Sequence, residues 1–533
     1  MTRLSTAERL LASQFDTDLE TDVLVIGGSM AGAWAALTAA DAGAKVLIVE
    51  KGWVGSAGVV AAATSAGYFV LPDNPKQRQW SIEMRHSEAG DLDDFDFIEG
   101  VLTDSYQGFK EMEQWGFRFG PKFGKMRGPD SMVFLRRELL RRNVVILDHS
   151  PALELLRDGD GVIAGATGVR RQRNQTWRVR AGAVVLATGG NAFRSGALGT
   201  NGCTGEGLLF AAEAGADFVG MEFSGHYMLT PLGSSCTKGG QYIWSKLIDD
   251  HGERLDTDLV FDQPLRVARA LLQGRKVCAI IDKVSKDKEA ELRLSMENFY
   301  VYFDRMNIDP FSTLWPVELR YEGTVRATGG VRIDAECGTA APGLFAAGDV
   351  TERIRLTGAA MSGAGSALAW CLSSGKRAGA AAAKFARRHG GGQNFRELEG
   401  LGGAGLRPLR SSRASAAELL RSVQAEILPL EKNAFRHEIQ LKRSLEALAA
   451  TWSSAVEGIA SLDAREALKS REVSAMAATG RWIYTAALER RETRGLHRRT
   501  DFPETDPNLR INFITGGLER PWVTASPLQS QAG

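Results

Sequence analysis

The feature that most constrains this chain is a glycine turn between an apolar run and an alanine-rich segment near the N-terminus. The run Val23–Ile26 is followed by residues 27–32, which read GGSMAG. The apolar run predicts a buried parallel strand, and the glycines predict a tight turn into a helix whose first N–H groups can bind a pyrophosphate. Ser29 stands where the usual fingerprint has its middle glycine. The turn therefore predicts a dinucleotide site with one local departure.

A second apolar run, Val46–Val49, ends in Glu50. An acidic residue about twenty positions past such a turn can accept hydrogen bonds from an unphosphorylated ribose. Glu50 thus favours FAD or NAD over NADP. Taken alone, the motif also fits an ordinary strand, turn and helix without a ligand.

The length and composition of the chain limit which classes of protein it can belong to. A chain of 533 residues exceeds a single hydrophobic core, and its net charge of +1 gives no argument for nucleic acid or an anionic membrane as partner. The five cysteines never form a C-x-x-C pair, so we predict no iron–sulfur cluster, metal site or disulfide framework. Neither a signal-peptide core nor a run of about eighteen apolar residues occurs, which predicts a cytoplasmic protein without direct membrane insertion.

Two later segments also have the pattern of buried strands that end in glycines. They are residues 183–190 (AVVLATGG) and 342–350 (PGLFAAGDV). After a glycine-rich stretch near 391–403, apolar residues at three- and four-residue spacing predict packed amphipathic helices. This organisation predicts a nucleotide-binding domain split into 20–220 and 327–390, an insertion at 221–326, and a helical C-terminal domain with its tail at 395–533.

Four separated segments, in this order, resemble the flavoprotein superfamily of succinate dehydrogenase, fumarate reductase, L-aspartate oxidase and adenylylsulfate reductase. They are the first turn, Ala187–Gly190, Gly343–Asp349 and Glu492–Pro503. The last reads ETRGLHRRTDFP, and its Arg-Gly, basic stretch and Asp-Phe-Pro are distinctive of that superfamily. The resemblance implies an α/β fold: a Rossmann-like FAD-binding domain with an inserted α+β capping domain and a C-terminal helical domain.

The resemblance also implies which residues hold FAD. Asp349, at a strand end, is expected to bind a ribityl hydroxyl, with a plain helix cap as the alternative. The helix that starts near Gly363 is expected to direct its N–H groups toward the flavin pyrimidine. Respiratory members attach FAD through a histidine in the small-residue loop, and residues 56–67 contain none, so we expect non-covalent FAD. The expected contacts are Gly27, Ser29, Met30, Ala31, Gly32, Glu50, Lys51, Ser56, Ala57, Gly58, Ala187, Thr188, Gly189, Gly348, Asp349, Gly363, Ser366 and Ala367.

The substrate side departs from the family. Val325 replaces a family histidine, and Met361 replaces the substrate arginine; a thioether cannot bind a carboxylate as an arginine does, so we expect succinate and fumarate to be unlikely substrates. His226 is expected to bind substrate or transfer a proton, with a hydrogen-bonded cap histidine as the alternative. Arg266 and Arg269 are candidates for the family's proton-shuttling arginine, with a solvated helix face as the alternative.

Residues 56–61 and 114–116 look closer to the adenylylsulfate reductase branch, whose members work with a separate iron–sulfur subunit. Because cluster cysteines are lacking, we predict a ferredoxin-like iron–sulfur partner. The chain is predicted to be an FAD-dependent oxidoreductase that transfers a hydride or electrons between the flavin and a small polar or anionic organic or sulfur-containing substrate. Two alternatives stay open: a flavin oxidase that uses dioxygen, and a non-catalytic flavoprotein subunit.

Overall fold

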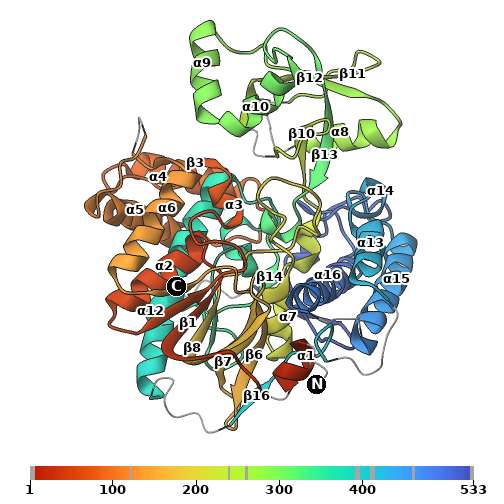
Figure 1. Ribbon diagram of the computed structural model, residues 1–533. Coiled ribbons are helices and arrows are strands. Elements are labelled where there is room, and N and C mark those ends of the chain that lie inside the picture. The colour runs from red at the N-terminus through yellow and green to blue at the C-terminus, as the bar shows by residue number, and fades with distance from the viewer. Residues whose placement is uncertain are drawn as a thin grey trace.

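The computed structural model of the protein describes residues 6–11, 13–120, 123–237, 240–257, 262–390, 397–407, 414–458 and 463–528. Figure 1 shows three parts: a sheet flanked by helices at the base, a smaller body that stands away from it, and a group of helices beside the sheet. None of the helices in the described ranges is long and apolar enough to cross a membrane.

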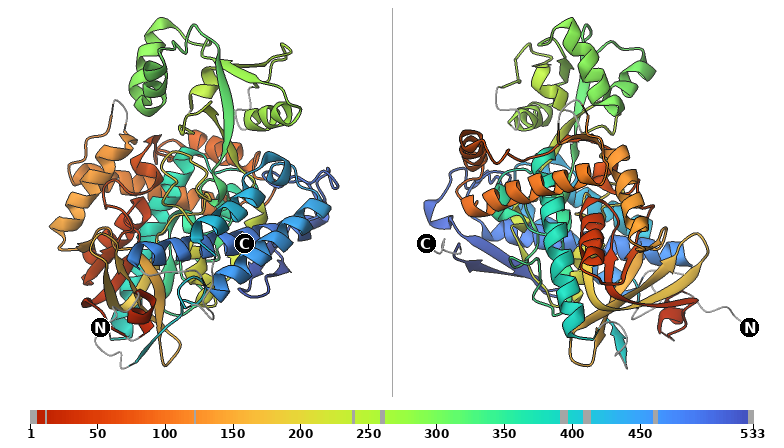
Figure 2. Two further views of the ribbon diagram at one scale, coloured as in Figure 1. Left: turned by 45° about the vertical axis from the view of Figure 1, so that its right-hand side comes forward. Right: turned by 90° about the vertical axis from the view of Figure 1, so that its left-hand side faces the viewer.

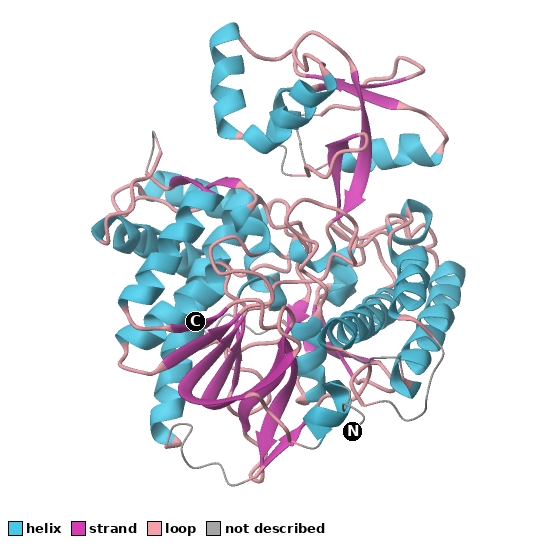
Figure 3. Ribbon diagram, in the orientation of Figure 1, coloured by secondary structure: helices cyan, strands magenta, loops and turns pink. Residues whose placement is uncertain are grey.

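The central sheet has the strand order β16-β6-β7-β8-β1-β2-β5, and β15 also pairs with β8. Strands β15, β8, β1, β2 and β5 run parallel to one another. Their carboxyl ends therefore meet at one edge, where open α/β sheets bind ligands. Figure 3 shows these strands side by side. The bounds are β1 Thr17–Ile26, β2 Val46–Val49, β5 Val145–Leu147, β6 Ala152–Asp158, β7 Ile163–Arg170, β8 Gln175–Leu186, β15 Leu344–Ala346 and β16 Leu398–Gly400.

Helix α2 (Met30–Asp41) packs against the long helix α12 (Ala364–Arg388), as the right-hand view of Figure 2 shows. Two glycines of α12 allow this close approach. A Cβ at Gly375 would lie 2.6 Å from the carbonyl oxygen of Ala31, and a Cβ at Gly379 would overlap that of Ala35. Nearby elements are α3 Gly58–Ala61, β3 Thr64–Ala66, α4 Pro75–His86, α5 Phe95–Gln114, β4 Lys125–Arg127 and α6 Gly128–Arg141. Helix α1 (Thr6–Leu11) contacts β8 and α16.

The capping domain is an antiparallel sheet of order β10-β13-β12-β11 with helices around it. It has an apolar core of its own, in which Phe299 and Phe303 pack on Trp315. It leaves the FAD-binding domain after η1 (Met221–Ser224) and returns at η3 (Gly323–Val325). Its elements are β10 Tyr227–Pro231, η2 Gly240–Trp244, β11 Lys246–Asp249, α8 Gln263–Leu272, β12 Val277–Ile280, α9 Lys286–Ser295, α10 Glu297–Met306 and β13 Trp315–Tyr321.

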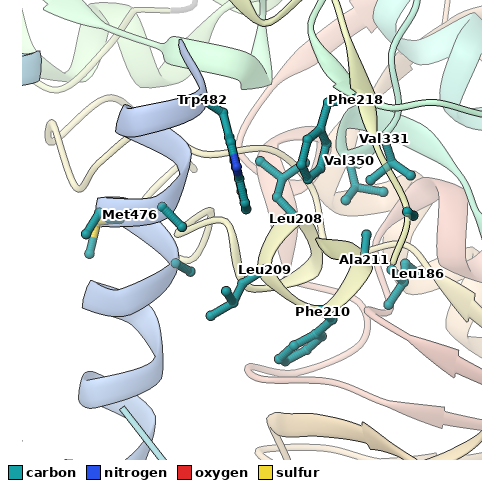
Figure 4. Close-up of a cluster of buried hydrophobic side chains, with 14 of the residues drawn as sticks. Leu186, Leu208, Leu209, Phe210, Ala211, Phe218, Val331, Val350, Met476 and Trp482 are labelled. Atoms are coloured by element: carbon teal, nitrogen blue, oxygen red, sulfur yellow. The ribbon is translucent and has the colours of Figure 1, made fainter. Parts of the chain in front are cut away.

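The C-terminal helical domain places α16 (Ala464–Glu489) against the FAD-binding domain. Helix α7 (Glu206–Glu213) lies between α16 and the sheet, and Trp482 of α16 meets Phe218 with ring centroids 4.4 Å apart (Figure 4). After the helices, β17 pairs with β9 of the FAD-binding domain. The remaining elements are β9 Phe218–Val219, β14 Gly330–Val331, η4 Gly348–Val350, α11 Ile354–Thr357, α13 Ala416–Ile427, α14 Leu430–Asn433, α15 Glu438–Glu457, η6 Pro507–Leu509, β17 Asn512–Gly516 and β18 Trp522–Ser526.

Candidate active site

A cavity of about 540 Å³ lies at the carboxyl ends of the parallel strands. Segments that follow β1, β2, β8 and β15 all contribute to it, because parallel strands end at the same edge. Of the residues expected to contact FAD, its lining contains Gly27, Ser29, Ala31, Glu50, Lys51, Ser56, Ala57, Gly58, Ala187, Thr188, Gly189 and Asp349. The others, Met30, Gly32, Gly348, Gly363, Ser366 and Ala367, lie outside this lining.

The glycine turn requires glycine at two positions. Gly27 has φ +104°, and a Cβ there would overlap the carbonyl oxygen of Ala187. A Cβ at Gly32 would overlap the carbonyl oxygen of Gly27, so the third glycine lets α2 pack on the turn. Ser29 is accommodated because the residue that faces its Oγ is Gly58, which has no side chain. The departure from the fingerprint is thus matched by a glycine in the neighbouring loop.

Glu50 is held in one orientation by two backbone donors. Its Oε2 accepts from the N–H of Gly28 at 2.7 Å, and its Oε1 accepts from the N–H of Gly52 at 2.6 Å. A carboxylate oxygen has two lone pairs, so each can accept a further hydrogen bond from a ribose hydroxyl. The glycine cradle and this oriented carboxylate fit the adenosine end of FAD.

Lys51 lines the same cavity within a buried cluster of charges. Its Nζ donates to Glu206 at 2.6 Å, to Thr204 at 2.8 Å and to Glu472 at 3.1 Å. Burial lowers the pKa of Lys51, but the two carboxylates raise it more, and the net effect is an increase. Arg194 also pairs with Glu472. Because Glu472 belongs to α16, the C-terminal domain forms part of the first cavity, a contribution that no sequence motif predicted.

Asp349 makes an ion pair rather than a helix cap. Its Oδ1 accepts from Nη1 of the buried Arg353 at 2.6 Å. Arg353 also donates to the carbonyl oxygens of Ala327 at 2.8 Å and of Val325 at 2.9 Å. These carbonyls belong to the segment that returns from the capping domain. Arg353 thus connects the Asp349 carboxylate, which lines the first cavity, to the base of the cap.

A second cavity, of about 230 Å³, lies where the three parts of the fold meet. Two backbone hydrogen bonds fix one wall: Leu496 N donates to Ala359 O at 2.9 Å, and Ser362 N donates to Arg326 O at 2.8 Å. The lining comprises Ser87, Glu88, Ala360 and Met361 from the FAD-binding domain, Gly225, His226, Tyr227, Asp262, Pro264, Leu265 and Ala268 from the cap, and Ala434, Gly495, Leu496 and Arg498 from the C-terminal domain.

Of the three residues expected to act in catalysis, His226 lines this cavity. Arg266 and Arg269 lie on the exposed face of α8, outside the lining, and the guanidinium of Arg269 sits 5.4 Å from the ring centroid of Phe435. The structure therefore does not bring the two arginines together with His226 in this cavity. Their expected role stays a prediction.

His226 is 4% exposed and belongs to a buried polar cluster. Its Nε2 lies 3.5 Å from Oε2 of Glu322 and makes no hydrogen bond within the described residues. Glu322 accepts a 2.7 Å hydrogen bond from Thr237, and Nε of Arg326 lies 3.8 Å from its Oε2. A carboxylate at this distance can orient the ring and interact with a positive charge on it. No local pattern in the sequence pointed to the pairing of Glu322 with His226.

Arg498 also lines the second cavity. It was not predicted as a site residue, because the segment Glu492–Pro503 was used only to recognise the family resemblance. Burial lowers the pKa of Arg498 to about 10, Asp262 opposes that shift, and Arg269 and Arg436 add to it. Burial likewise raises the pKa of Glu88. The cavity thus combines an arginine and a histidine with two carboxylates.

Known proteins share this architecture. The family model described as FAD binding domain matches residues 22–368, and the model described as fumarate reductase flavoprotein C-term matches residues 426–517. One relative is a subunit of the fumarate reductase (CoM/CoB) of Methanothermobacter marburgensis. It is 26% identical over 562 residues, which cover 93% of this chain and 97% of that protein.

Two solved structures have the same fold. E. coli quinol fumarate reductase matches with a TM-score of 0.81 at 19% identity, covering 97% of this chain and 98% of that one. Adenylylsulfate reductase from Archaeoglobus fulgidus matches with a TM-score of 0.75 at 18% identity, covering 97% of each chain.

The prediction that succinate and fumarate are unlikely substrates finds no support here, because the methanogen relative is named as a fumarate reductase. The predicted cofactor and fold class are confirmed by the matched models. The first model spans well over half of the chain, and the second follows it in the expected order. This protein belongs to the fumarate reductase and succinate dehydrogenase flavoprotein family of FAD-dependent oxidoreductases.

Proposed function

We propose that this oxidoreductase transfers a hydride or electrons between FAD in the first cavity and a small polar or anionic organic or sulfur-containing substrate in the second. The observation that carries the proposal is the short stretch of chain from Gly348 to Gly363. It supplies Asp349 to the first cavity and Met361 to the second. This one segment thus contributes to both cavities, which favours direct exchange between their occupants.

The bound FAD supplies the hydride or electron chemistry, and the protein side chains supply binding and proton transfer. Nε2 of His226 is the proposed group that binds the substrate or exchanges a proton with it, with Glu322 as its orienting partner. Leu265, Met361 and Leu496 make part of the wall apolar, which limits water around the reacting atoms.

The cofactor is proposed to be non-covalently bound. The small-residue loop that borders the first cavity includes Ser56, Ala57 and Gly58, and residues 56–67 contain no histidine to form the family's covalent bond. Acid precipitation of the purified protein should release all of its FAD into the supernatant. Flavin fluorescence that stays with the protein would contradict non-covalent binding.

A separate iron–sulfur protein is the proposed electron partner. The scattered cysteines support it, and no group of three or more His, Cys, Asp or Glu side chains able to hold a metal ion occurs in the described part of the chain. The methanogen relative is named as one subunit of its enzyme, which supports assembly with another chain. A ferredoxin-like partner that co-purifies with this protein would support the proposal.

The proposal is tested by anaerobic titration of the purified, FAD-loaded protein. Small organic acids, sulfonates and succinate are added to the oxidised protein, and fumarate to the reduced protein. We expect at least one compound to change the flavin absorbance at a rate that saturates with concentration. Peroxide formation in air without a partner protein would favour a flavin oxidase, and no response to any compound would favour a non-catalytic subunit.

A further inference from the structure

Arg498 has an unsatisfied donor in the second cavity. Its Nη1 makes no hydrogen bond within the described residues, although the atom is shielded from solvent. Polar atoms in such positions nearly always have a partner, and a buried charge without one is costly. The missing acceptor can be supplied by a molecule in the cavity that Arg498 lines.

His226 provides a second, independent indication of a ligand. The side chain is 4% exposed, lines the same cavity, and has an Nε2 without a hydrogen bond among the described residues. Two side chains, each with a nitrogen that lacks a hydrogen bond among the described residues, therefore border one cavity. His226, whose Nε2 lies 3.5 Å from Oε2 of Glu322, comes from the cap, and Arg498 comes from the C-terminal domain.

The charges around Arg498 favour an anion at this position. Arg269 and Arg436 act on Arg498 as positive neighbours, and Asp262 is the negative one. A guanidinium binds carboxylates strongly because its planar fork presents two parallel N–H donors. Because Met361 carries no charge, it cannot provide this contact from its side of the cavity.

Two carboxylates in the same lining, Asp262 and Glu88, limit how many anionic groups the cavity can accept, although Oε2 of Glu88 lies 3.7 Å from Nη1 of Arg85. A substrate with one anionic group can pair with Arg498 and leave an apolar part against Leu265 and Leu496. A second anionic group would meet repulsion from the two carboxylates in a partly desolvated space.

We propose that Arg498 binds the anionic group of the substrate and that Glu88 and Asp262 select an organic acid with a single carboxylate. This inference rests on the proposed function, because it assigns the second cavity to the substrate. It places the anion-binding side chain in the C-terminal domain, six residues after Glu492 in the segment that docks on Ala359.

The test uses butanoate and succinate as probes, since they share a four-carbon chain and differ in the number of carboxylates. Their dissociation constants are measured by ligand-observed NMR on oxidised, FAD-loaded protein. We expect butanoate to bind at least about tenfold more tightly than succinate. R498Q should weaken butanoate binding by about ten- to a hundredfold, the effect of losing a charge-assisted hydrogen bond.

R443Q is the matched control, because Arg443 is exposed on α15 and lies outside both cavity linings. It removes the same charge and should leave both constants unchanged. R498K keeps a charge and should restore part of the affinity, provided that FAD content and unfolding midpoint match the wild type. D262N should reduce the preference for butanoate over succinate.

Equal binding of butanoate by the wild type and R498Q would overturn the inference, as would tighter binding of succinate or no binding of either probe. If an uncharged compound reduces the flavin while neither probe binds, the oxidoreductase proposal stands and this inference is wrong. If butanoate binding depends on Arg498 but no compound reduces the flavin, the anion site stands and the proposed function fails.

Discussion

Arg353 and Asp349 form a 2.6 Å ion pair in which the arginine side chain is fully buried. Because the other N–H groups of Arg353 bind carbonyl oxygens at the base of the cap, the pair couples the cofactor cavity to the cap's return segment. The Asp349 carboxylate in the lining of the first cavity therefore has an orientation fixed by the protein. This coupling makes the pair the first target for mutation.

Replacement of Arg353 by glutamine should lower the free energy of unfolding by about 3–5 kcal/mol, because it leaves the Asp349 carboxylate without its buried counter-charge. FAD content should fall as well. Denaturant unfolding monitored by circular dichroism gives the first value, and the flavin absorbance of the purified protein gives the second.

R355Q is the matched control for R353Q. Arg355 pairs with Asp94 near the surface, where its side chain is 38% exposed. R355Q should therefore lower the free energy of unfolding by only about 0–1 kcal/mol. Equal losses in the two variants would show that the Arg353 pair has no special structural role.

The sequence was sufficient to predict the cofactor but not the full lining of its cavity. The glycine turn, Glu50 and Asp349 could be recognised because each follows a strand within a short local motif. Glu472 could not, because its contact with Lys51 joins residues 421 positions apart and depends on how α16 packs. Local patterns predict which strands carry the site, whereas contacts between domains need the folded chain.

The two arginines on α8 show why the substrate side was harder to predict. Arg266 and Arg269 are three residues apart and share one face of α8. That face is exposed to solvent, because the opposite face carries the buried residues Val267, Ala268 and Ala270. The spacing of the apolar residues along α8 could have predicted that these two arginines are exposed. No sequence pattern singled out Arg498, because its place in the site depends on a cavity that three separate parts of the chain form together.

Gly32 should be intolerant of even a small side chain. In G32A the added Cβ overlaps the carbonyl oxygen of Gly27, so α2 must shift away from the turn. We expect the purified variant to lose most of its FAD, measured as the ratio of flavin to protein absorbance. G159A is the control, since nothing lies within 4 Å of a Cβ at Gly159. Full FAD occupancy in G32A would show that α2 does not need to pack this closely on the turn.

Removal of the Lys51 charge should destabilise the protein in a pH-dependent manner. In the wild type, burial raises the pKa of Glu206, but Lys51 and hydrogen bonds lower it more, and the net effect is a decrease. The pair with Lys51 therefore contributes stability above the ordinary glutamate pKa and loses it as the pH falls. K51M removes the charge that most opposes the effect of burial, so we expect the pKa of Glu206 to rise and stability to be gained as the carboxyl becomes protonated. K51M should therefore lower the free energy of unfolding by about 3 kcal/mol at neutral pH and by less at a pH of about 5.

Denaturant midpoints of K51M and the wild type at both pH values measure this effect. K442M serves as the control, because Lys442 pairs with Glu438 at the surface of α15 and should show little change at either pH. If the loss of stability in K51M is constant with pH, or grows toward low pH, Glu206 is not the carboxylate that loses its counter-charge.

The proposed mechanism requires the substrate to react in the second cavity beside His226. The most direct measurement is the anaerobic stopped-flow rate of flavin reduction by the best substrate, in the wild type, in H226Q and in H251Q, whose histidine is exposed on the cap outside both linings. We predict that H226Q slows this rate by about 10²- to 10⁴-fold with FAD content unchanged, whereas H251Q matches the wild type. A wild-type rate in H226Q would show that His226 neither binds the substrate nor transfers its proton.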